Sequence, residues 1–332
     1  MASKSVLRVS KRARPRPCVS TARPWKKSAS GSRPDPHRRS VRPTGRFAPS
    51  PSGPLHAGSL LAALASYVDA RQRGGRWLLR IDDLDPDRSS PTATRDILDC
   101  LAAHGLHHDG PVRYASSAAD RHHRALDALW QAGLVYACRC RRAVLRAHAA
   151  DVGHPRYSGA CRALDLPRAG HAARLRVGDK PALWQSAVGH SHSERVDTAV
   201  GDFALQRRDG VIAYQLAVVV DDADDRVTDV VRGADLLDNT GRQVYLHRAL
   251  GLALPRYLHV PVLHGDDGRK LSKSNGAHAV DPATALPNLQ SAWDRLGQMP
   301  SPTDIRSTDT FLTWATAHWR RDRASHDGDA RP

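Results

Sequence analysis

Two short segments, far apart in the chain, contain the residues best suited to phosphate chemistry. The first, residues 45–59, reads Gly-Arg-Phe-Ala-Pro-Ser-Pro-Ser-Gly-Pro-Leu-His-Ala-Gly-Ser. A loop of this kind before a helix leaves backbone N–H groups free to bind phosphate or carboxylate oxygens. The second segment, Lys270-Leu-Ser-Lys-Ser274, places Lys270 and Lys273 three residues apart, as compact charges suited to a polyphosphate. Together the two segments predict a nucleotide site.

The elements around the first segment predict a strand–helix–strand unit. We expect a strand over residues 42–47, then the loop, then an alanine- and leucine-rich helix over residues 60–72. A pair of glycines turns the chain into a second strand over residues 76–81, and Asp82 follows directly. Because the carboxyl ends of parallel strands meet at one edge of a sheet, this order predicts a ligand crevice at that edge.

The remaining elements complete an α/β pattern with a parallel sheet. Helices are predicted over residues 91–105, 117–132, 240–250 and 310–321, and strands over residues 211–220, 227–231 and 257–263. Residues 216–220 form an uninterrupted apolar run, which is typical of a strand buried on both faces. No run approaches the roughly 20 apolar residues that a membrane span needs, so we expect no membrane association.

The positive charge of the chain is concentrated at its N-terminus. Of the net charge of +16, residues 1–43 carry +12, from 13 Lys and Arg against one Asp. This segment is rich in Pro and Ser and lacks hydrophobic periodicity, so we predict a disordered tail. It fits a nucleic-acid-binding arm, an organellar targeting peptide, or an over-extended start before a folded protein that begins near Thr44.

Three of the five cysteines lie close together in the sequence and predict a metal site. Cys138 and Cys140 are followed after 16 residues by Tyr157 and then by Cys161. Thiolates are soft ligands suited to zinc, and a structural zinc takes four protein ligands. We therefore predict one structural Zn²⁺, with Tyr157 and His154 as the candidates for the fourth ligand. Buried apolar cysteines without metal are the alternative.

The two phosphate segments resemble the signature motifs of class I aminoacyl-tRNA synthetases. The histidine motif reads His56-Ala57-Gly58-Ser59, and Leu271 replaces the methionine of the lysine motif. The resemblance to glutamyl-tRNA synthetases covers most of residues 44–280 and includes residues 46–53, 79–83, 213–222 and 231–235. The chain is also similar to the truncated paralogues, the glutamyl-Q tRNA(Asp) synthetases, because Arg-Gly-Ala-Asp replaces the usual Arg-Gly-Glu-Asp and only 58 residues follow Ser274.

This resemblance implies a domain layout. Residues 44–133 and 196–274 are expected to form a Rossmann-like class I catalytic domain, interrupted by a zinc-binding insert of residues 134–195. Residues 275–332 are expected to form a short helical C-terminal segment without an anticodon-binding domain, which needs about 100–200 residues.

The resemblance also implies a reaction and its partners. L-glutamate and ATP, with Mg²⁺, would form glutamyl-adenylate and pyrophosphate. The glutamyl group would then pass to the cyclopentenediol ring of queuosine at the wobble position of tRNA(Asp). We expect a cytoplasmic monomer. The alternatives are a compact glutamyl- or glutaminyl-tRNA synthetase that charges the 3′ end of tRNA, and a non-catalytic paralogue.

Adenylate formation joins two anions, so positioning and charge neutralisation are expected to provide most of the catalysis. By resemblance, the catalytic candidates are His56, Gly58, Ser59, Lys270 and Lys273. The ATP-binding candidates are Pro49, His56, Gly58 and Lys273.

Glutamate recognition needs cations for two carboxylates and an acceptor for the ammonium group. Arg46 and Arg232 are the cationic candidates, because a guanidinium can hold a carboxylate through two hydrogen bonds. We expect Asp82, which replaces the glutamate of the family pattern, to accept the ammonium group, with Asp83 in reserve. Tyr214 is expected to supply a hydroxyl. The remaining candidates for this pocket are Phe47, Ala48, Pro49 and Ser50.

The resemblance bears on the zinc site as well. The family completes its three cysteines with a tyrosine, which implies Tyr157 as the fourth ligand and leaves His154 as the alternative. Arg139, Arg141 and Arg142 lie next to the cysteines and suit a surface that meets tRNA.

Overall fold

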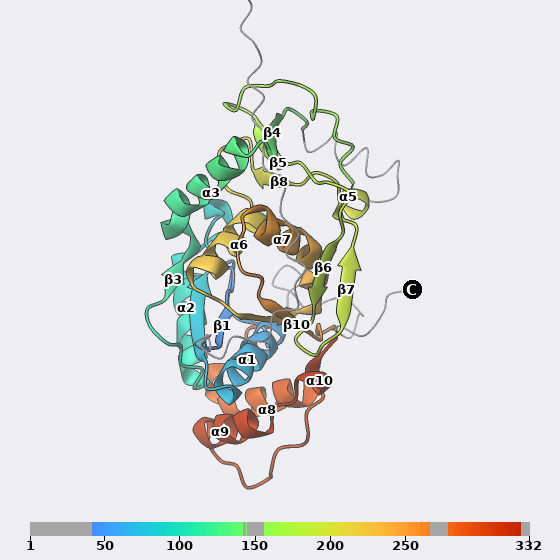
Figure 1. Ribbon diagram of the computed structural model, residues 1–332. Helices are drawn as coiled ribbons and strands as arrows, with labels where there is room; N and C mark the ends of the chain where they lie inside the picture. Colours follow the sequence, from blue (N-terminus) through green and yellow to red (C-terminus); the bar gives the residue numbers. More distant parts are fainter. Residues whose placement is uncertain (1–41, 142–143, 145–155, 266–277, 327–332) are drawn as a thin grey trace, which may run out of the picture. The chain divides into compact units, whose positions relative to one another are not determined.

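The computed structural model describes residues 42–141, 144, 156–265 and 278–326 (Figure 1). In chain order, its strands and helices are β1 (Thr44–Phe47), α1 (Ala57–Gln72), β2 (Arg76–Ile81), α2 (Pro91–Ala103), β3 (Arg113–Tyr114), α3 (Ala119–Gln131), β4 (Val135–Cys138), β5 (Ala172–Leu175), β6 (Ala182–Gln185), β7 (Ser191–Glu194), α5 (Val196–Ala199), β8 (Ala204–Gln206), α6 (Tyr214–Asp224), β9 (Asp229–Gly233), α7 (Leu237–Ala249), β10 (Arg256–Val260), α8 (Ala285–Arg295), α9 (Thr308–His318) and α10 (Arg321–Ala324).

Parallel strands form the centre of the fold, as predicted. β1 pairs with β2 and β2 with β3, both in parallel, with Thr44 opposite Arg76. A second parallel pair joins β9 to β10. β1 and β9 lie side by side, and the Thr228 N–H donates to the Thr44 carbonyl at 2.9 Å. The carboxyl ends of β1, β2 and β9 therefore come close together, and the predicted glutamate-pocket residues other than Tyr214 lie in or directly after these ends.

Helix α1 packs against β1 and β9 and begins three residues earlier than the predicted start at residue 60. His56 is its N-cap, with extended backbone and a ring nitrogen that accepts the Ser59 N–H at 3.3 Å. The cap sets the start of the helix, because it satisfies a backbone donor that has no partner within the first turn. The helix N-terminus therefore stands directly at the end of the proline- and glycine-rich loop.

The predicted strand over residues 211–220 is wrong, because most of this segment forms helix α6. Three consecutive valines favoured a strand by propensity, but α6 is covered by α3 and α7, and Leu216, Ala217 and Val219 are each at most 1% exposed. A short apolar run without a solvent-facing side has no period that separates a strand from a helix. Tertiary packing therefore overrides β-propensity here.

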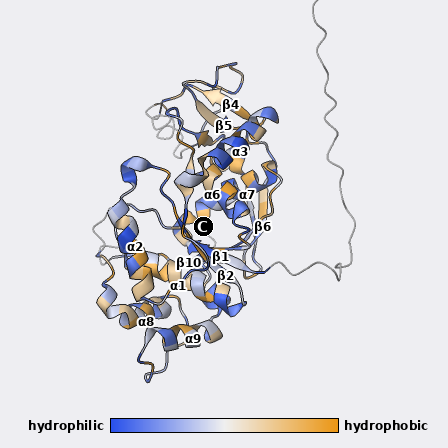
Figure 2. Cartoon of the chain, turned by 90° about the vertical axis from the view of Figure 1, so that its left-hand side faces the viewer, coloured by the Kyte–Doolittle hydropathy of each residue, from blue (hydrophilic) through white to orange (hydrophobic). Residues whose placement is uncertain are grey.

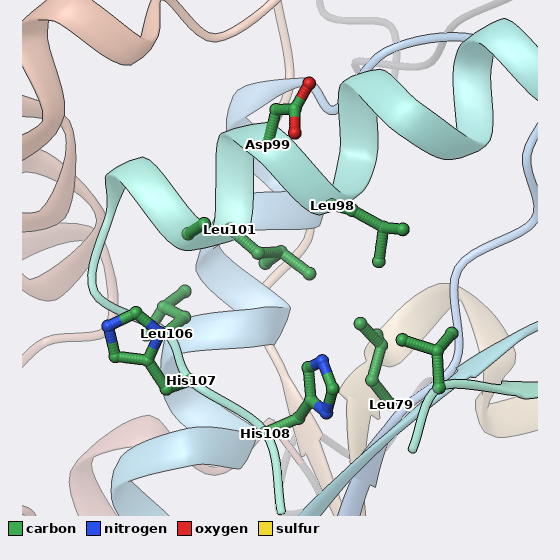
Figure 3. A pocket seen from close by; sticks show the side chains of 9 residues that line it. Leu79, Leu98, Asp99, Leu101, Leu106, His107 and His108 are labelled. Carbon is green, nitrogen blue, oxygen red and sulfur yellow. The ribbon is translucent and has the colours of Figure 1, made fainter. Parts of the chain in front are cut away.

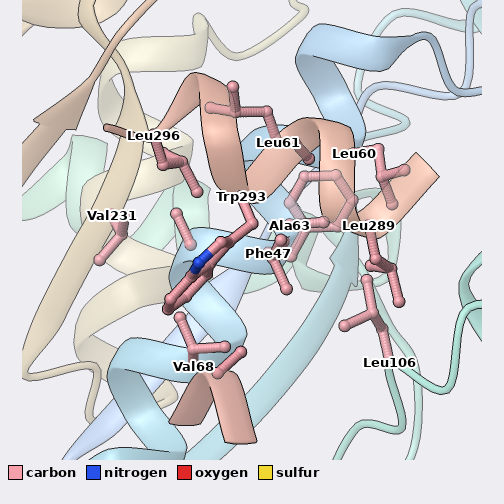
Figure 4. Close-up of a cluster of buried hydrophobic side chains, with 14 of the residues drawn as sticks. Phe47, Leu60, Leu61, Ala63, Val68, Leu106, Val231, Leu289, Trp293 and Leu296 are labelled. Atoms are coloured by element: carbon pink, nitrogen blue, oxygen red, sulfur yellow. The ribbon is translucent and has the colours of Figure 1, made fainter. Parts of the chain in front are cut away.

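The C-terminal helices belong to the same hydrophobic core as α1. Trp293 of α8 and Phe311 of α9 are completely buried, and Figure 4 shows Trp293 beside Ala63 and Val68 of α1. The sequence analysis predicted a helix over residues 310–321 but not α8, which has a proline in its first turn. A proline is tolerated there, because its missing N–H has no partner within the helix at that position.

Antiparallel strands follow the first helices. β4, β5 and β8 form one sheet, and β6 pairs with β7. β8 pairs with β5 although it lies beyond residue 195, the predicted end of the insert.

Figure 2 shows both hydrophilic and hydrophobic residues along α2 and α9, as expected for helices with one buried face. Within the described residues, no helix has the length and hydrophobicity needed to cross a membrane.

Candidate active site

The proline- and glycine-rich loop ends at a histidine that is tied to the start of α1. His56 accepts the Ser59 N–H, and its other ring nitrogen lies 3.0 Å from the Ser59 hydroxyl. A Cβ atom on Gly58 would come within 3.2 Å of the His56 ring, so glycine leaves room for that ring over the helix N-terminus. Two of the predicted catalytic residues, His56 and Ser59, are thus in direct contact.

Lys270 and Lys273 lie outside the described residues. The chain on their C-terminal side does return to the histidine loop, because Ala279 forms a β-bridge with His56. The Val280 N–H also donates to the Leu55 carbonyl at 2.9 Å. The lysine segment is therefore joined, within a few residues of sequence, to a strand-like segment beside His56.

A buried network of charges lies at the carboxyl ends of β1 and β2. The Asp222 carboxylate accepts Arg46 Nε–H at 3.3 Å and Arg80 Nη1–H at 2.8 Å. Arg80 also donates to Asp82 at 3.2 Å. Burial alone would lower the pKa of Arg80, but the carboxylates of Asp222, Asp82 and Asp221 raise it instead. Asp222 thus joins Arg46, a predicted carboxylate ligand, to the arginine that holds Asp82.

Arg232 is buried at the end of β9 among neutral side chains, with 4% of its surface exposed. It donates to Gln243 Oε1 and to Thr240 Oγ1, both at 2.7 Å, and Nε lies 3.3 Å from His259 Nε2. Tyr257 places its ring against the guanidinium, with 5.0 Å between Cζ and the ring centre. Burial lowers the pKa of Arg232. In the described part of the chain, no ion pair joins Arg232 to a carboxylate.

The structure brings the predicted glutamate-binding residues close enough to influence one another. Burial lowers the pKa of Arg232. Tyr214 raises this pKa, and the positive charge of Arg46 lowers it further. Burial raises the pKa of Asp82, while the charges of Arg80 and Arg46 oppose this rise. Arg46 therefore lies within electrostatic range of both Asp82 and Arg232, and Tyr214 lies within range of Arg232.

The other predicted pocket residues follow β1 directly. Phe47 and Pro49 are buried, Ala48 is partly buried and Ser50 is exposed. The Asp82 N–H donates to the Pro49 carbonyl at 3.0 Å, which fixes the loop against the end of β2. Asp83, the reserve candidate, is occupied elsewhere, because it accepts both the backbone N–H and the hydroxyl of Ser116.

The sequence analysis gave no role to several residues that hold this site together. Asp222, Thr240, Gln243 and His259 contact the two predicted arginines through side chains from α6, α7 and β10. Asp222 is the second of two aspartates after an apolar run, which is a signal for a functional carboxylate only once its partners are known. The other three lie in ordinary helix and strand sequence, and nothing in their spacing marked them.

The predicted metal ligands come together at the end of β4. Sγ atoms of Cys138, Cys140 and Cys161 lie within 4.8 Å of one another. Tyr157 Oη lies 3.3 Å from Cys138 Sγ and 3.7 Å from Cys140 Sγ, and it accepts the Cys161 N–H at 3.1 Å. Burial alone would raise the pKa of Cys161, but the hydrogen bond with Tyr157 and other hydrogen bonds lower it to about 7. His154 lies outside the described residues.

This donor set fits one soft divalent metal ion. Three thiol sulfurs and one phenol oxygen converge from two separate chain segments, in the number that a tetrahedral site needs. Cysteine sulfurs at this separation can be bridged by one ion, and thiolates favour zinc over magnesium or calcium.

Two cavities lie near the parallel strands. One, of about 430 Å³, borders the candidate site and is lined by residues that include Pro51, Asp83 and the exposed Tyr114. The other, of about 300 Å³, lies under α2 and is lined by residues that include Leu79, Leu101 and His108 (Figure 3). None of the described residues that line the second cavity was predicted to take part in binding or catalysis.

Comparison with known sequences gives a consistent family. Residues 43–285 match the family of class I tRNA synthetases for glutamate and glutamine (E and Q), catalytic domain. A glutamyl-Q tRNA(Asp) synthetase of Xanthomonas campestris is 50% identical over 282 residues, which are 84% of this chain and 92% of the relative. Proteins with the same name from Pseudomonas fluorescens and Burkholderia mallei are 47% and 48% identical, over 83% and 84% of this chain and 91% and 96% of the relatives.

Solved structures show a similar fold at lower sequence identity. The glutamate-tRNA synthetase of Elizabethkingia anophelis superposes with a TM-score of 0.70 at 24% identity, over 86% of this chain and 67% of that protein. A methionyl-tRNA synthetase of Mycobacterium tuberculosis gives a TM-score of 0.51 at 14% identity, over 77% and 64% of the two chains. These likenesses establish the class I catalytic fold.

Proposed function

This chain belongs to the class I tRNA synthetases for glutamate and glutamine and, among them, to the glutamyl-Q tRNA(Asp) synthetases, and from this membership we propose its reaction in detail. The protein is a ligase that activates L-glutamate with ATP. It then transfers the glutamyl group to queuosine at the wobble position of tRNA(Asp). The names of the relatives support this choice of acceptor.

The observation that best supports glutamate as the substrate is the environment of Arg232. In the described part of the chain, the buried Arg232 guanidinium contacts a hydroxyl, an amide, an imidazole and an aromatic ring but forms no ion pair with a carboxylate. Burying a charge without an ion-pair partner is costly, so binding of an anion beside this guanidinium is strongly favourable in free energy. One carboxylate of glutamate supplies that anion, held through two hydrogen bonds.

Glutamate carries a second carboxylate and an ammonium group, and the neighbouring residues suit both. Arg46 is held by Asp222 through Nε, which leaves the outer edge of its guanidinium for the second carboxylate. Asp82 lies at the end of β2 and accepts a hydrogen bond from Arg80, with a second oxygen available for the ammonium group. Asp82 is shorter than the glutamate it replaces and therefore reaches less far into the pocket. It binds the ammonium group either directly or through a bridging water.

Adenylate formation is an in-line displacement at the α-phosphate. A carboxylate oxygen of glutamate forms a bond to phosphorus, and the bond from phosphorus to the bridging oxygen breaks to release pyrophosphate. His56, Gly58 and Ser59 at the start of α1 bind the phosphates, with Pro49 in the same loop. Lys273 and Lys270 stabilise the negative charge that develops on the α-phosphate and pyrophosphate. Mg²⁺ that enters with ATP neutralises phosphate charge and needs few protein ligands.

In the second step, a hydroxyl of the queuosine ring attacks the carbonyl carbon of glutamyl-adenylate. An ester forms, the bond to the phosphate oxygen breaks, and AMP leaves with the electron pair. The hydroxyl proton passes to AMP or to solvent. The protein contributes mainly by holding the two reactants in position.

We further propose that Cys138, Cys140, Cys161 and Tyr157 hold one structural Zn²⁺. Convergence of three sulfurs and a phenol oxygen supports this proposal, as does the family resemblance. When bound, the metal ties the end of β4 to the segment that contains Tyr157 and so stabilises the insert.

The acceptor is tested with labelled glutamate, ATP and four RNAs. These are tRNA(Asp) with queuosine, the same tRNA without its 3′-terminal adenosine, a tRNA(Asp) transcript without queuosine, and tRNA(Glu). We expect equal labelling of the first two and no labelling of the others, because the acceptor is the modified base. Nuclease digestion then locates the label in the anticodon nucleoside.

Labelling of tRNA(Glu), lost when the 3′-terminal adenosine is removed, would instead identify a compact enzyme that charges tRNA and would refute the proposal. Pyrophosphate exchange that depends on glutamate, measured in parallel, tests the activation step without tRNA. The monomeric state and the cytoplasmic location stay predictions.

A further inference from the structure

One buried arginine beside the cysteine cluster has no carboxylate partner in the described part of the chain. Arg174 of β5 is 7% exposed, and its Nη1–H donates to the backbone carbonyl of Asp202 at 2.7 Å. The Asp202 carboxylate is instead held by Arg162, at 2.5 and 2.7 Å, and by the Tyr136 hydroxyl. Burial of an unpaired guanidinium is costly, so the fold must give Arg174 negative charge of another kind.

The remaining contacts of Arg174 are with predicted metal ligands. Its Nε–H donates to Cys138 Sγ at 3.3 Å. Its Cζ lies 4.1 Å from the centre of the Tyr157 ring, within the range of a cation–π contact. One arginine therefore touches two of the four candidate ligands.

The metal-bound cluster would itself carry a negative charge next to Arg174. Three thiolates around a divalent ion leave a net negative charge, and a phenolate as the fourth ligand increases it. We propose that Arg174 is the counter-ion of this metal–thiolate cluster and positions Cys138 and Tyr157 toward the metal. The inference depends on the proposed metal site and is independent of the proposed acceptor.

Such a residue acts through the ligands and not on the metal itself. A hydrogen bond to Cys138 fixes the direction of its sulfur, and the guanidinium over Tyr157 favours ring orientations that keep the oxygen near the sulfurs. Partners of this kind typically change metal affinity by about 10–100-fold. Loss of the Arg174 charge should therefore weaken the metal site without removing any ligand.

The test compares zinc affinity in the full-length protein and three variants, by competition with a chromophoric chelator. Arg174→Gln can still form a hydrogen bond to sulfur but lacks the charge, and we expect its zinc affinity to fall about 10–100-fold. Arg174→Lys keeps the charge and should stay within about tenfold of the parent protein. Arg176→Gln is the matched control, because Arg176 stacks on Tyr136 at 4.8 Å and, within the described residues, contacts none of the candidate ligands.

A second readout is the absorption spectrum of the Co²⁺-substituted protein, in which sulfur-to-metal charge-transfer bands report the thiolates. We expect Arg174→Gln to shift or weaken these bands at saturating Co²⁺, whereas Arg176→Gln leaves them unchanged. Equal zinc affinity in Arg174→Gln and Arg176→Gln would overturn the proposal.

Poor folding of Arg174→Gln would shift the decision to Arg174→Lys, where a loss of more than about tenfold would also overturn it. Absence of zinc binding by the parent protein would refute the metal site itself, together with this inference. Glutamyl transfer to tRNA does not enter any of these measurements.

Discussion

Asp222→Asn tests how the carboxylate of α6 supports the candidate glutamate pocket. The side chain is 6% exposed and pairs with Arg46 at 3.3 Å and Arg80 at 2.8 Å. Removal of one partner from a buried ion pair costs about 3–5 kcal/mol. Asparagine keeps one oxygen acceptor, so we expect the lower value, about 3 kcal/mol. At about 1.5–2 °C per kcal/mol for a chain of this size, the melting temperature should fall by about 4.5–6 °C.

The same change should weaken glutamate binding selectively. Without the Asp222 charge, Arg46 loses the partner that orients it, and Arg80 remains paired mainly with Asp82. We expect the KM for glutamate in pyrophosphate exchange to rise about tenfold, which corresponds to about 1.4 kcal/mol of binding. The KM for ATP should change little, because Asp222 is held by Arg46 and Arg80, neither of which is predicted to bind ATP.

Asp224→Asn, in the same helix, is the control. Its carboxylate is 39% exposed and pairs with Arg113 at 2.7 Å near the surface, where such a pair contributes about 0–1 kcal/mol. If Asp222→Asn melts within about 2 °C of Asp224→Asn, the reasoning about the buried network is wrong. An unchanged KM for glutamate in Asp222→Asn would separately refute its connection to the pocket.

Four further predictions follow from the site and the core. Lys273→Ala should lower pyrophosphate exchange by at least about hundredfold with an unchanged melting temperature, and normal exchange would refute its assigned role. Arg232→Met should raise the KM for glutamate by at least about thirtyfold, or 2 kcal/mol, and a smaller rise would argue against a carboxylate contact. Trp293→Ala, at a completely buried position, should cost about 3–5 kcal/mol in urea unfolding, and a loss below about 1 kcal/mol would contradict its place in the core. Burial alone would raise the pKa of Asp229, but hydrogen bonds with Arg73 and Thr228 lower it. This carboxylate therefore stabilises the fold above its unfolded pKa of about 3.9, and the stabilisation is lost as the pH falls through the lower pKa of the folded state. Asp229→Asn should therefore reduce the acid-induced loss of the urea midpoint, and an unchanged pH profile would show that this carboxylate contributes nothing.

The sequence analysis located the strand–loop–helix unit because each of its parts has a local cause. The run over residues 76–81 is bounded by two glycines and by two aspartates, and β2 has the same limits. The histidine loop ends where a capping side chain can satisfy the first turn of α1. These signals depend on neighbours in sequence and need no information about packing.

Local signals were misleading for α6 and were overlooked for α8. The valines of α6 favour a strand, and only the cover of α3 and α7 makes a helix of that length stable. Helix α8 has apolar residues at helical spacing that the sequence prediction overlooked, and its Trp293 completes a core together with α1 and α9. Both helices depend on contacts between segments far apart in the chain.

The sequence by itself determined which residue types could bind phosphates, carboxylates and a soft metal, because motif chemistry depends on composition and spacing. Tertiary structure alone decided that Asp222 joins Arg46 to Arg80, that Arg232 is surrounded by neutral groups, and that Arg174 faces Cys138. Each of these contacts connects residues at least 8 positions apart. Their energies come from burial and from the direction of side chains on packed elements, neither of which a linear pattern records.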